Sequence, residues 1–251
     1  MEEDRELSEL SRMIAKARRA VVFTGAGIST ESGIPDFRGP GGIWTKMAPI
    51  DFADFLASEE ARILSWQRRF EADETLRSAR PNRGHRAVAA LFGRGTLAAV
   101  ITQNIDGLHQ ASGIPEERVI ELHGSTTHAR CLDCSRRYEI EALRRAFEET
   151  RKAPVCESCG GFIKTATISF GQSMPETPMR RAHSETLAAD LFLVAGSSLV
   201  VYPAAGFPEL AKTNGAALVI VNREPTPLDG IADLALHRTI GETLGAALGV
   251  E

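Results

Sequence analysis

Short apolar runs recur along the chain and alternate with segments of helical periodicity. The runs cover residues 20–24, 98–102, 191–195 and 217–222, with a weaker one over residues 232–236. Apolar positions recur at helical spacing over residues 7–17, 84–92 and 204–214. Apolar strands that alternate with helices are typical of a parallel sheet covered on both faces. The pattern therefore predicts an α/β fold.

Two long segments depart from this alternation. Residues 39–80 begin with a loop rich in glycine and proline and continue as a mixed helical segment that carries Trp44 and Trp66. Residues 126–167 hold all four cysteines and show little strand pattern. We expect these two segments to meet in a second, smaller domain. The sheet domain would then comprise residues 1–38, 81–125 and 168–251.

Composition and charge narrow the class of protein. The 251 residues are 43% hydrophobic and 25% charged, and the net charge is −4. This charge offers no basic stripe for nucleic acid and favours a basic peptide as a macromolecular partner. The N-terminus lacks the apolar run of a secretory signal, and no segment reaches the ~18 apolar residues of a membrane span. We therefore expect a cytoplasmic protein that binds neither nucleic acid nor membrane.

The cysteines form two Cys-x-x-Cys pairs. Cys131 and Cys134 make the first pair, Cys156 and Cys159 make the second, and residues 135–155 separate them. This spacing is close to that of a zinc ribbon, in which four thiolates surround one ion. A closed thiolate shell leaves no coordination position for a substrate, so we predict a structural Zn²⁺. An iron–sulfur cluster and redox-active thiols remain alternatives.

The first apolar run ends in a glycine-containing turn, Gly25-Ala26-Gly27-Ile28-Ser29. Glycines at this position let the backbone approach a diphosphate, whose charge the following helix can receive. The third glycine of a dinucleotide fingerprint is missing, however, and no acidic residue ends a second strand about twenty positions on. A tight strand-to-helix turn accounts for these residues equally well.

Polar residues follow two other runs. Gln-Asn-Ile-Asp occupies residues 103–106, and Gly-Ser-Ser occupies residues 196–198. Ligands of open parallel sheets bind where strands end, although a simple turn and a helix cap would explain these residues as well. His123 lies downstream, and a single histidine is more often structural than catalytic. We interpret as structural or solvated the remaining histidines, His85, His109, His128, His183 and His237.

Taken together, these motifs resemble those of the sirtuin family in its bacterial form. The matching segments, in the family's order, are residues 25–39, 102–109, 121–124, 131–134, 156–159, 196–198 and 222–224. The resemblance implies a Rossmann-like domain and a smaller domain made of a helical insert and a zinc ribbon. It also implies an NAD-dependent protein deacylase that yields free lysine, nicotinamide and 2′-O-acyl-ADP-ribose. NAD and an acyl-lysine peptide would enter one cleft from opposite sides.

The resemblance also implies a role for each matching residue. His123 would be the general base, and Asn104 would be a second catalytic residue. The substrate peptide would pair as an added strand with Ile168, Phe170 and Gly171. The residues implied in NAD binding are Gly25, Ala26, Gly27, Ser29, Ile34, Asp36, Phe37, Arg38, Gln103, Asn104, Ile105, Asp106, Gly196, Ser197, Ser198, Asn222, Arg223 and Glu224.

Two features bear on the acyl group. At Ser169 and Gln172 the chain departs from the family, which more often has a bulky aromatic residue and a glutamate there. Sirtuins that prefer succinyl or malonyl lysine resemble one another in a Tyr-x-x-Arg pair. The nearest pair here, Trp66-x-x-Arg69, lacks the phenol, and we interpret Arg68 and Arg69 as the solvated face of a helix. We therefore expect an uncharged acyl group, acetyl first.

Three other activities share parts of this pattern. Transfer of ADP-ribose to a protein side chain would use the same NAD-cleaving site. A hydride-transferring dehydrogenase is disfavoured by the missing third glycine of the fingerprint. A zinc-ribbon adaptor that only senses NAD would bind without turnover, which the intact residues 103–106 and His123 disfavour.

Overall fold

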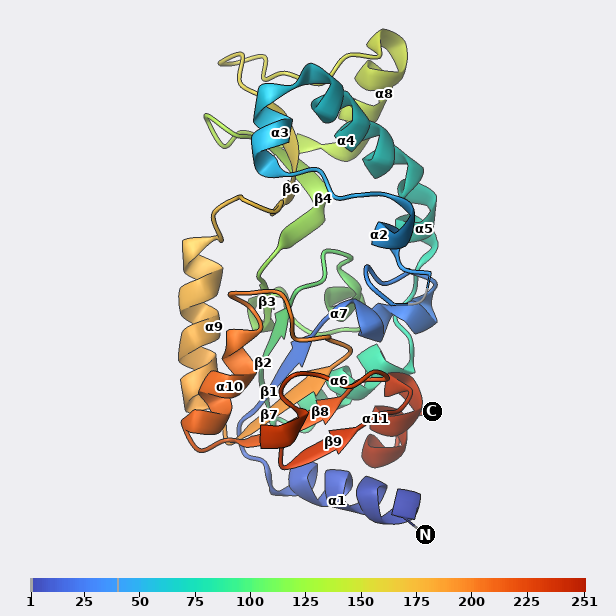
Figure 1. The fold of residues 1–251 in the computed structure, drawn as a ribbon, viewed down its shortest axis with the longest axis vertical. Helices are drawn as coiled ribbons and strands as arrows, with labels where there is room; N and C mark the ends of the chain where they lie inside the picture. Colours follow the sequence, from blue (N-terminus) through green and yellow to red (C-terminus); the bar gives the residue numbers. More distant parts are fainter. Residues whose placement is uncertain (1, 40) are drawn as a thin grey trace.

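The computed structural model describes residues 2–39 and 41–251, and its centre is a parallel sheet of six strands (Figure 1). The strands lie in the order β3-β2-β1-β7-β8-β9 and all pairs are parallel. Their bounds are Ala20–Thr24 (β1), Leu97–Thr102 (β2), Val119–Glu121 (β3), Leu191–Ala195 (β7), Ala217–Val221 (β8) and Leu234–Leu236 (β9). Each apolar run predicted as a strand overlaps one of them, and the predicted α/β class is confirmed.

Helices cover both faces of this sheet. One face is covered by α1 (Glu2–Lys16), α6 (Arg83–Gly93) and α11 (Ile240–Leu248), and the other by α9 (Glu176–Ala188) and α10 (Gly206–Thr213). Successive side chains of a strand point to opposite faces. Val22 therefore packs in the first layer, while Val21 and Phe23 pack in the second. The helical periodicity predicted from the sequence corresponds to α1, α6 and α10.

The order of the strands reverses at β1. From β1 the sheet extends through β2 to β3 on one side and through β7 and β8 to β9 on the other. At such a reversal the connections leave in opposite directions, which opens a crevice at the carboxyl ends of the central strands. The residues that follow β1, β2 and β7 are therefore brought to one edge of the sheet.

A smaller unit lies beyond this edge, at the top of Figure 1. It contains an antiparallel sheet in the order β5-β4-β6 and several helices. The bounds are Gly124–Cys131 (β4), Arg137–Glu139 (β5), Ile163–Thr167 (β6), Phe52–Ala57 (α3), Glu59–Glu71 (α4), Asp73–Ser78 (α5) and Ile140–Thr150 (α8). Trp66 is 1% exposed and packs in one cluster with Ile140 and Phe147, and its Nε1 donates to the Ile163 carbonyl at 3.2 Å. We infer that residues 39–80 and 126–167 form one folding unit.

Short helical segments complete the connections. They are η1 (Ala26–Ser32), α2 (Ile43–Lys46), α7 (Leu108–Ala111), η2 (Glu116–Arg118) and η3 (Asp229–Ile231). Within residues 2–39 and 41–251, no helix combines the length and the apolar character that crossing a bilayer requires.

Candidate active site

A crevice of about 400 Å³ lies between the carboxyl edge of the large sheet and the smaller unit. Sites for small molecules commonly have volumes of about 300–1,000 Å³. Most of the predicted site residues line it, namely Gly25, Ala26, Gly27, Asp36, Phe37, Arg38, Gln103, Asn104, Ile105, His123, Ile168, Phe170, Gly171, Gly196, Ser197, Ser198, Asn222 and Glu224. The fold thus brings together segments that lie far apart in the sequence.

Four predicted residues lie outside this lining. Ser29 is fully buried behind the crevice, and Ile34 is half-buried with its N–H bonded to the Ser29 carbonyl at 3.3 Å. Arg223 is exposed. Asp106 is half-buried, and its carboxylate accepts hydrogen bonds from within the protein. The roles proposed for these residues at NAD stay predictions.

The glycine-containing turn after β1 packs against the turn after β7. A Cβ atom on Gly25 would lie 2.7 Å from the Gly196 carbonyl oxygen, and one on Gly27 would lie 2.8 Å from the Gly196 Cα. The Gly27 N–H donates to the same carbonyl at 2.9 Å. Packing of the two turns therefore requires both glycines, which is the structural reason for the pattern. The resulting surface, bare of side chains, lines the crevice and can be approached closely by a diphosphate.

The loop after β2 is held from behind by Ser29. The Ser29 hydroxyl donates to Asp106 Oδ2 at 2.7 Å and accepts from Asn104 Nδ2 at 3.1 Å. Asp106 Oδ1 accepts from the Leu108 N–H at 2.9 Å. Gln103 Nε2 donates to the Ser197 hydroxyl at 2.8 Å, which ties this loop to the turn after β7. Hydrogen bonds therefore fix the polar side chains of the loop at the crevice wall.

His123 follows β3 and reaches the crevice beside this loop. Its Nδ1 lies 3.1 Å from the Gln103 carbonyl oxygen. A carbonyl can only accept, so this contact assigns the proton to Nδ1 and leaves Nε2 as the basic nitrogen. Burial lowers the pKa of His123 below its ordinary value, and the hydrogen bond to the Gln103 carbonyl opposes this shift. The ring is therefore neutral near pH 7 and able to accept a proton.

Two other histidines lie buried behind the site. His109 Nε2 is 2.9 Å from the Thr24 hydroxyl, and the ring centroids of His85 and His109 are 5.1 Å apart. Burial lowers the pKa of His85 to about 4 and that of His109 to about 3. Both rings are neutral parts of the packing, as the structural interpretation of these histidines expected.

The segment predicted to pair with a peptide forms another wall. Its Ile168 N–H donates to the His123 carbonyl at 2.9 Å. The two residues that depart from the family pattern bond to each other, because the Ser169 N–H donates to Gln172 Oε1 at 3.2 Å and the Gln172 N–H donates to the Ser169 carbonyl at 3.0 Å. The two departures thus form one local turn beside Phe170.

Aromatic residues that the sequence interpretation did not assign to the site also line the crevice. The Trp44 ring centroid lies 5.0 Å from that of Phe37 and 5.3 Å from that of Phe170, and all three residues line the crevice. Tyr202 lines it as well and is strongly exposed. Trp44 could have been suspected because it stands in the aromatic-rich segment 39–80, whereas nothing in the sequence singles out Tyr202.

The Trp66-x-x-Arg69 pair does not line the crevice. Trp66 packs in the core of the smaller unit, while Arg69 binds Asp73 and the Thr126 carbonyl. The interpretation of Arg69 as solvated is wrong, since its side chain is 11% exposed. Helical periodicity placed it on a polar face, but a buried carboxylate from the next helix covers that face. Arg68 is half-buried rather than fully solvated, and its Nη1 donates to the Ala48 carbonyl at 2.7 Å.

The four cysteines gather at one point of the smaller unit. All four sulfur atoms lie within 4.8 Å of one another, with Cys131 3.5 Å from Cys159 and Cys134 3.6 Å from Cys156. Zn–S bonds of about 2.3 Å in a tetrahedron place sulfur atoms roughly 3.8 Å apart, so the donor set fits Zn²⁺. A disulfide would need about 2.05 Å. None of these cysteines lines the crevice, which agrees with a structural ion.

Comparisons with known proteins agree with this geometry. A sequence model of the Sir2 family matches residues 25–203. The NAD-dependent protein deacetylase 1 of Bradyrhizobium diazoefficiens is 59% identical over 243 residues, which cover 97% of this chain and 95% of that protein. A solved Sir2–p53 peptide–NAD⁺ complex is 37% identical with a TM-score of 0.86, and 97% of each chain is covered.

A solved structure of Sir2Tm bound to a propionylated peptide is 35% identical, with a TM-score of 0.86 and coverage of 97% of this chain and 98% of that one. The family match spans more than half of the sequence, and the curated relative aligns over nearly all of it. The chain belongs to the Sir2 family.

Proposed function

We propose that this protein is an NAD-dependent protein-lysine deacylase that removes uncharged acyl groups, acetyl foremost. One observation carries the proposal: a single crevice contains the glycine-containing turn, the basic Nε2 of His123 and the segment 168–171. The relative at 59% identity is named as a deacetylase. One similar Sir2 structure holds a p53 peptide and NAD⁺, and another holds a propionylated peptide.

The residues present fit NAD as the co-substrate. A side chain at Gly25, Gly27 or Gly196 would collide with neighbouring backbone atoms, so these three positions stay bare of side chains. A diphosphate can therefore come close to the main chain there. Gln103 and Asn104 would face the nicotinamide ribose, and Asn222 and Glu224 the adenosine half. When bound, NAD supplies a sugar carbon that loses nicotinamide and accepts the acyl oxygen of the substrate.

The protein's own contribution is orientation, exclusion of water and transfer of a proton. Phe37, Trp44 and Phe170 pack into one aromatic wall of the crevice, and such an apolar wall would favour a dry site around the bound reactants. A weak nucleophile such as an amide oxygen gains most from being held in line with the reacting carbon. His123 takes a proton from a ribose hydroxyl at Nε2 while Nδ1–H stays bonded to the Gln103 carbonyl. Zn²⁺ takes no part in these steps.

The pH dependence of turnover tests the role of His123. A general base must be unprotonated, and burial lowers the pKa of this ring from 6.5. Turnover should therefore be constant at neutral pH and fall only as the pH decreases through a value below 6.5. The measurement is kcat at saturating NAD and peptide from roughly pH 5 to pH 9. An acidic limb centred at about pH 7.5 would contradict this assignment.

The acyl preference follows from the charges around the crevice. Among the described residues that line it, Arg38 is the one lysine or arginine, and its guanidinium lies over the Trp44 ring at 4.1 Å. Asp36 also lines the crevice and adds a negative charge to it. Removing a carboxylate from water without a cationic partner is costly. A succinyl tail should therefore be disfavoured.

The test compares acetyl, propionyl and succinyl forms of one peptide. We expect kcat/KM for the acetyl peptide to exceed that for the succinyl peptide by at least about tenfold. A clear preference for the succinyl peptide would contradict the proposed substrate class. Labelled ADP-ribose that stays covalently on protein, without release of nicotinamide that depends on the acyl peptide, would instead indicate ADP-ribose transfer.

A further inference from the structure

A bulge in β4 turns Thr126 away from its own sheet. Gly124 pairs with Thr167 and Ala129 pairs with Thr165, so residues 125–128 face Ala166 alone on β6. Buried main-chain groups need partners, and Thr126 finds them elsewhere. Its N–H and its hydroxyl both donate to the Ile105 carbonyl, at 3.1 Å and 2.7 Å. The bulge therefore reaches the loop after β2.

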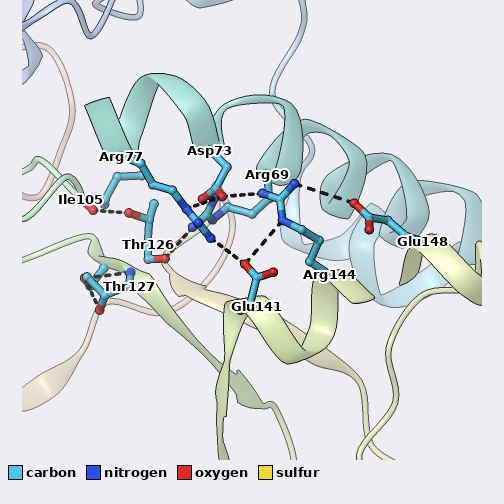
Figure 2. Close-up of polar contacts among 10 residues, drawn as sticks. Arg69, Asp73, Arg77, Ile105, Thr126, Thr127, Glu141, Arg144 and Glu148 are labelled. Atoms are coloured by element: carbon cyan, nitrogen blue, oxygen red, sulfur yellow. Dashed lines mark hydrogen bonds and ion pairs between the residues drawn. The ribbon is translucent and has the colours of Figure 1, made fainter. Parts of the chain in front are cut away.

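Arg69 holds the other side of Thr126. Its Nη2 donates to the Thr126 carbonyl at 3.1 Å, and its Nη1 donates to Asp73 Oδ1 at 2.8 Å (Figure 2). The planar guanidinium offers its donors in a fixed geometry, so the position of Asp73 determines the direction of the bond to Thr126. One continuous series of hydrogen bonds thus joins Asp73 to Ile105.

Asp73 is the fixed point of this series. Its side chain is 8% exposed, and besides Arg69 it binds Arg77 Nε at 2.7 Å and Arg144 Nη2. Burial alone would raise the pKa of Asp73, but the hydrogen bond and charge of Arg69, with the charges of Arg144 and Arg77, lower it overall. The carboxylate is therefore ionised at neutral pH and binds three arginines from α4, α5 and α8.

Acidic side chains on α8 form further ion pairs with Arg77 and Arg144, two of the three arginines that bind Asp73. Glu141 lies 2.7 Å from Arg77 and 3.9 Å from Arg144, and Glu148 lies 3.9 Å from Arg144. Figure 2 shows Glu148 on the far side of Arg144 from Thr126. Arg69 has no such second acid among the described ion pairs, so its free donors are available for the Thr126 carbonyl.

We propose that Asp73, Arg69 and Thr126 are positioning residues that hold the loop after β2 in place for the reaction. None of the three lines the crevice, and the hydrogen bonds from Thr126 to the Ile105 carbonyl connect them to the loop that does. Ile105 lies between Asn104 and Asp106 in the chain and itself lines the crevice. The inference rests on the proposed role of residues 103–106 in holding NAD.

Matched substitutions at two adjacent threonines test it. Thr126→Val removes the hydroxyl bonded to Ile105, whereas Thr127→Val removes an exposed hydroxyl that contacts only Ser125 and His128. In the zinc-loaded protein we expect Thr126→Val to raise the Kd for NAD about two- to tenfold, the usual effect of one hydrogen bond. Amide hydrogen exchange of residues 103–107 should become faster. Thr127→Val and the conservative Thr126→Ser should match the wild type in both measurements.

Asp73→Asn is expected to weaken NAD binding more, by at least about tenfold, because it leaves buried guanidinium groups without a carboxylate. Arg77→Gln is its control, since Arg77 binds Asp73 but is 61% exposed and does not touch Thr126. Its effect on the Kd for NAD should stay below about twofold. Peptide affinity and zinc content should be unchanged in every variant. If Asp73→Asn does not fold, the comparison of Thr126→Val with Thr127→Val still tests the inference.

Three results would overturn the inference. Thr126→Val and Thr127→Val could behave alike, or Thr126→Val could leave both exchange and NAD affinity at wild-type values. Alternatively, exchange of residues 103–107 could rise while the Kd for NAD stays unchanged. That last result would also reject the proposed role of the loop at NAD, whereas either of the first two would leave that role intact.

Discussion

Replacing His123 by alanine is expected to lower kcat for deacylation about 10²- to 10⁴-fold, the usual contribution of a general base. The ring is the basic group beside the loop after β2, and its Nδ1 is already committed to the Gln103 carbonyl. Without it, no neutral imidazole accepts the proton from the ribose hydroxyl. The measurement is single-turnover formation of acyl-ADP-ribose with an acetyl-lysine peptide.

The control for this variant is His183→Ala. His183 is exposed on α9 and does not line the crevice, so its loss should leave kcat within about twofold of wild type. NAD affinity and thermal stability of His123→Ala should remain close to wild type, because the ring makes one hydrogen bond within the protein. A His123→Ala enzyme with wild-type turnover would falsify the assignment of the base.

Replacing Cys131 by alanine is expected to release zinc and unfold the smaller unit. Cys131 and Cys156 are buried in the cluster that contains Trp66, so the metal shell and the apolar core share residues. Binding of structural Zn²⁺ is worth about 10–16 kcal/mol near neutral pH, and that free energy is folding free energy. We expect less than about one tenth of the wild-type zinc content and a clearly lower Tm.

Ser158→Ala is the matched control, because Ser158 lies within the second Cys-x-x-Cys pair but provides no thiolate. It should keep its zinc and its activity. Zinc content by atomic spectroscopy and the Tm report metal and fold separately. A Cys131→Ala protein that is soluble, active and zinc-free would show that the metal does not hold the unit together.

The large sheet was predictable because its strands are apolar on both faces. The run 191–195, for example, is fully buried in β7 and contrasts sharply with its polar neighbours. Two kinds of strand could not be predicted in the same way. β3 has three residues, too few for a pattern, and β5 (Arg137–Glu139) is polar and mostly exposed. Their pairing partners, which are distant in the sequence, define them.

The part of the candidate site that could be predicted consists of glycine and polar residues directly after strands. Gly25, Gly27 and His123 follow β1 and β3, and the parallel sheet brings such ends to one edge. Tyr202 and the burial of Arg69 could not be foreseen in this way. The place of Tyr202 at the crevice and the burial of Arg69 both depend on contacts between segments that are distant in the sequence. The local pattern of apolar and polar residues does not predict such contacts.

We propose that the smaller unit is inserted in two pieces, residues 39–80 and 126–167, so that the chain would cross between the two units four times, near residues 38–39, 80–81, 124–126 and 167–168. Arg38 and Ile168, which line the crevice, lie at the first and the last of these crossings, and His123, which also lines it, precedes the third. Any hinge rotation that widened the gap between the units would bend the chain at these points. The crossings therefore couple the width of the opening to the placement of the base and of the peptide-binding segment. A substitution on the smaller unit that rotates this unit would therefore displace His123 and residues 168–171 without touching either of them.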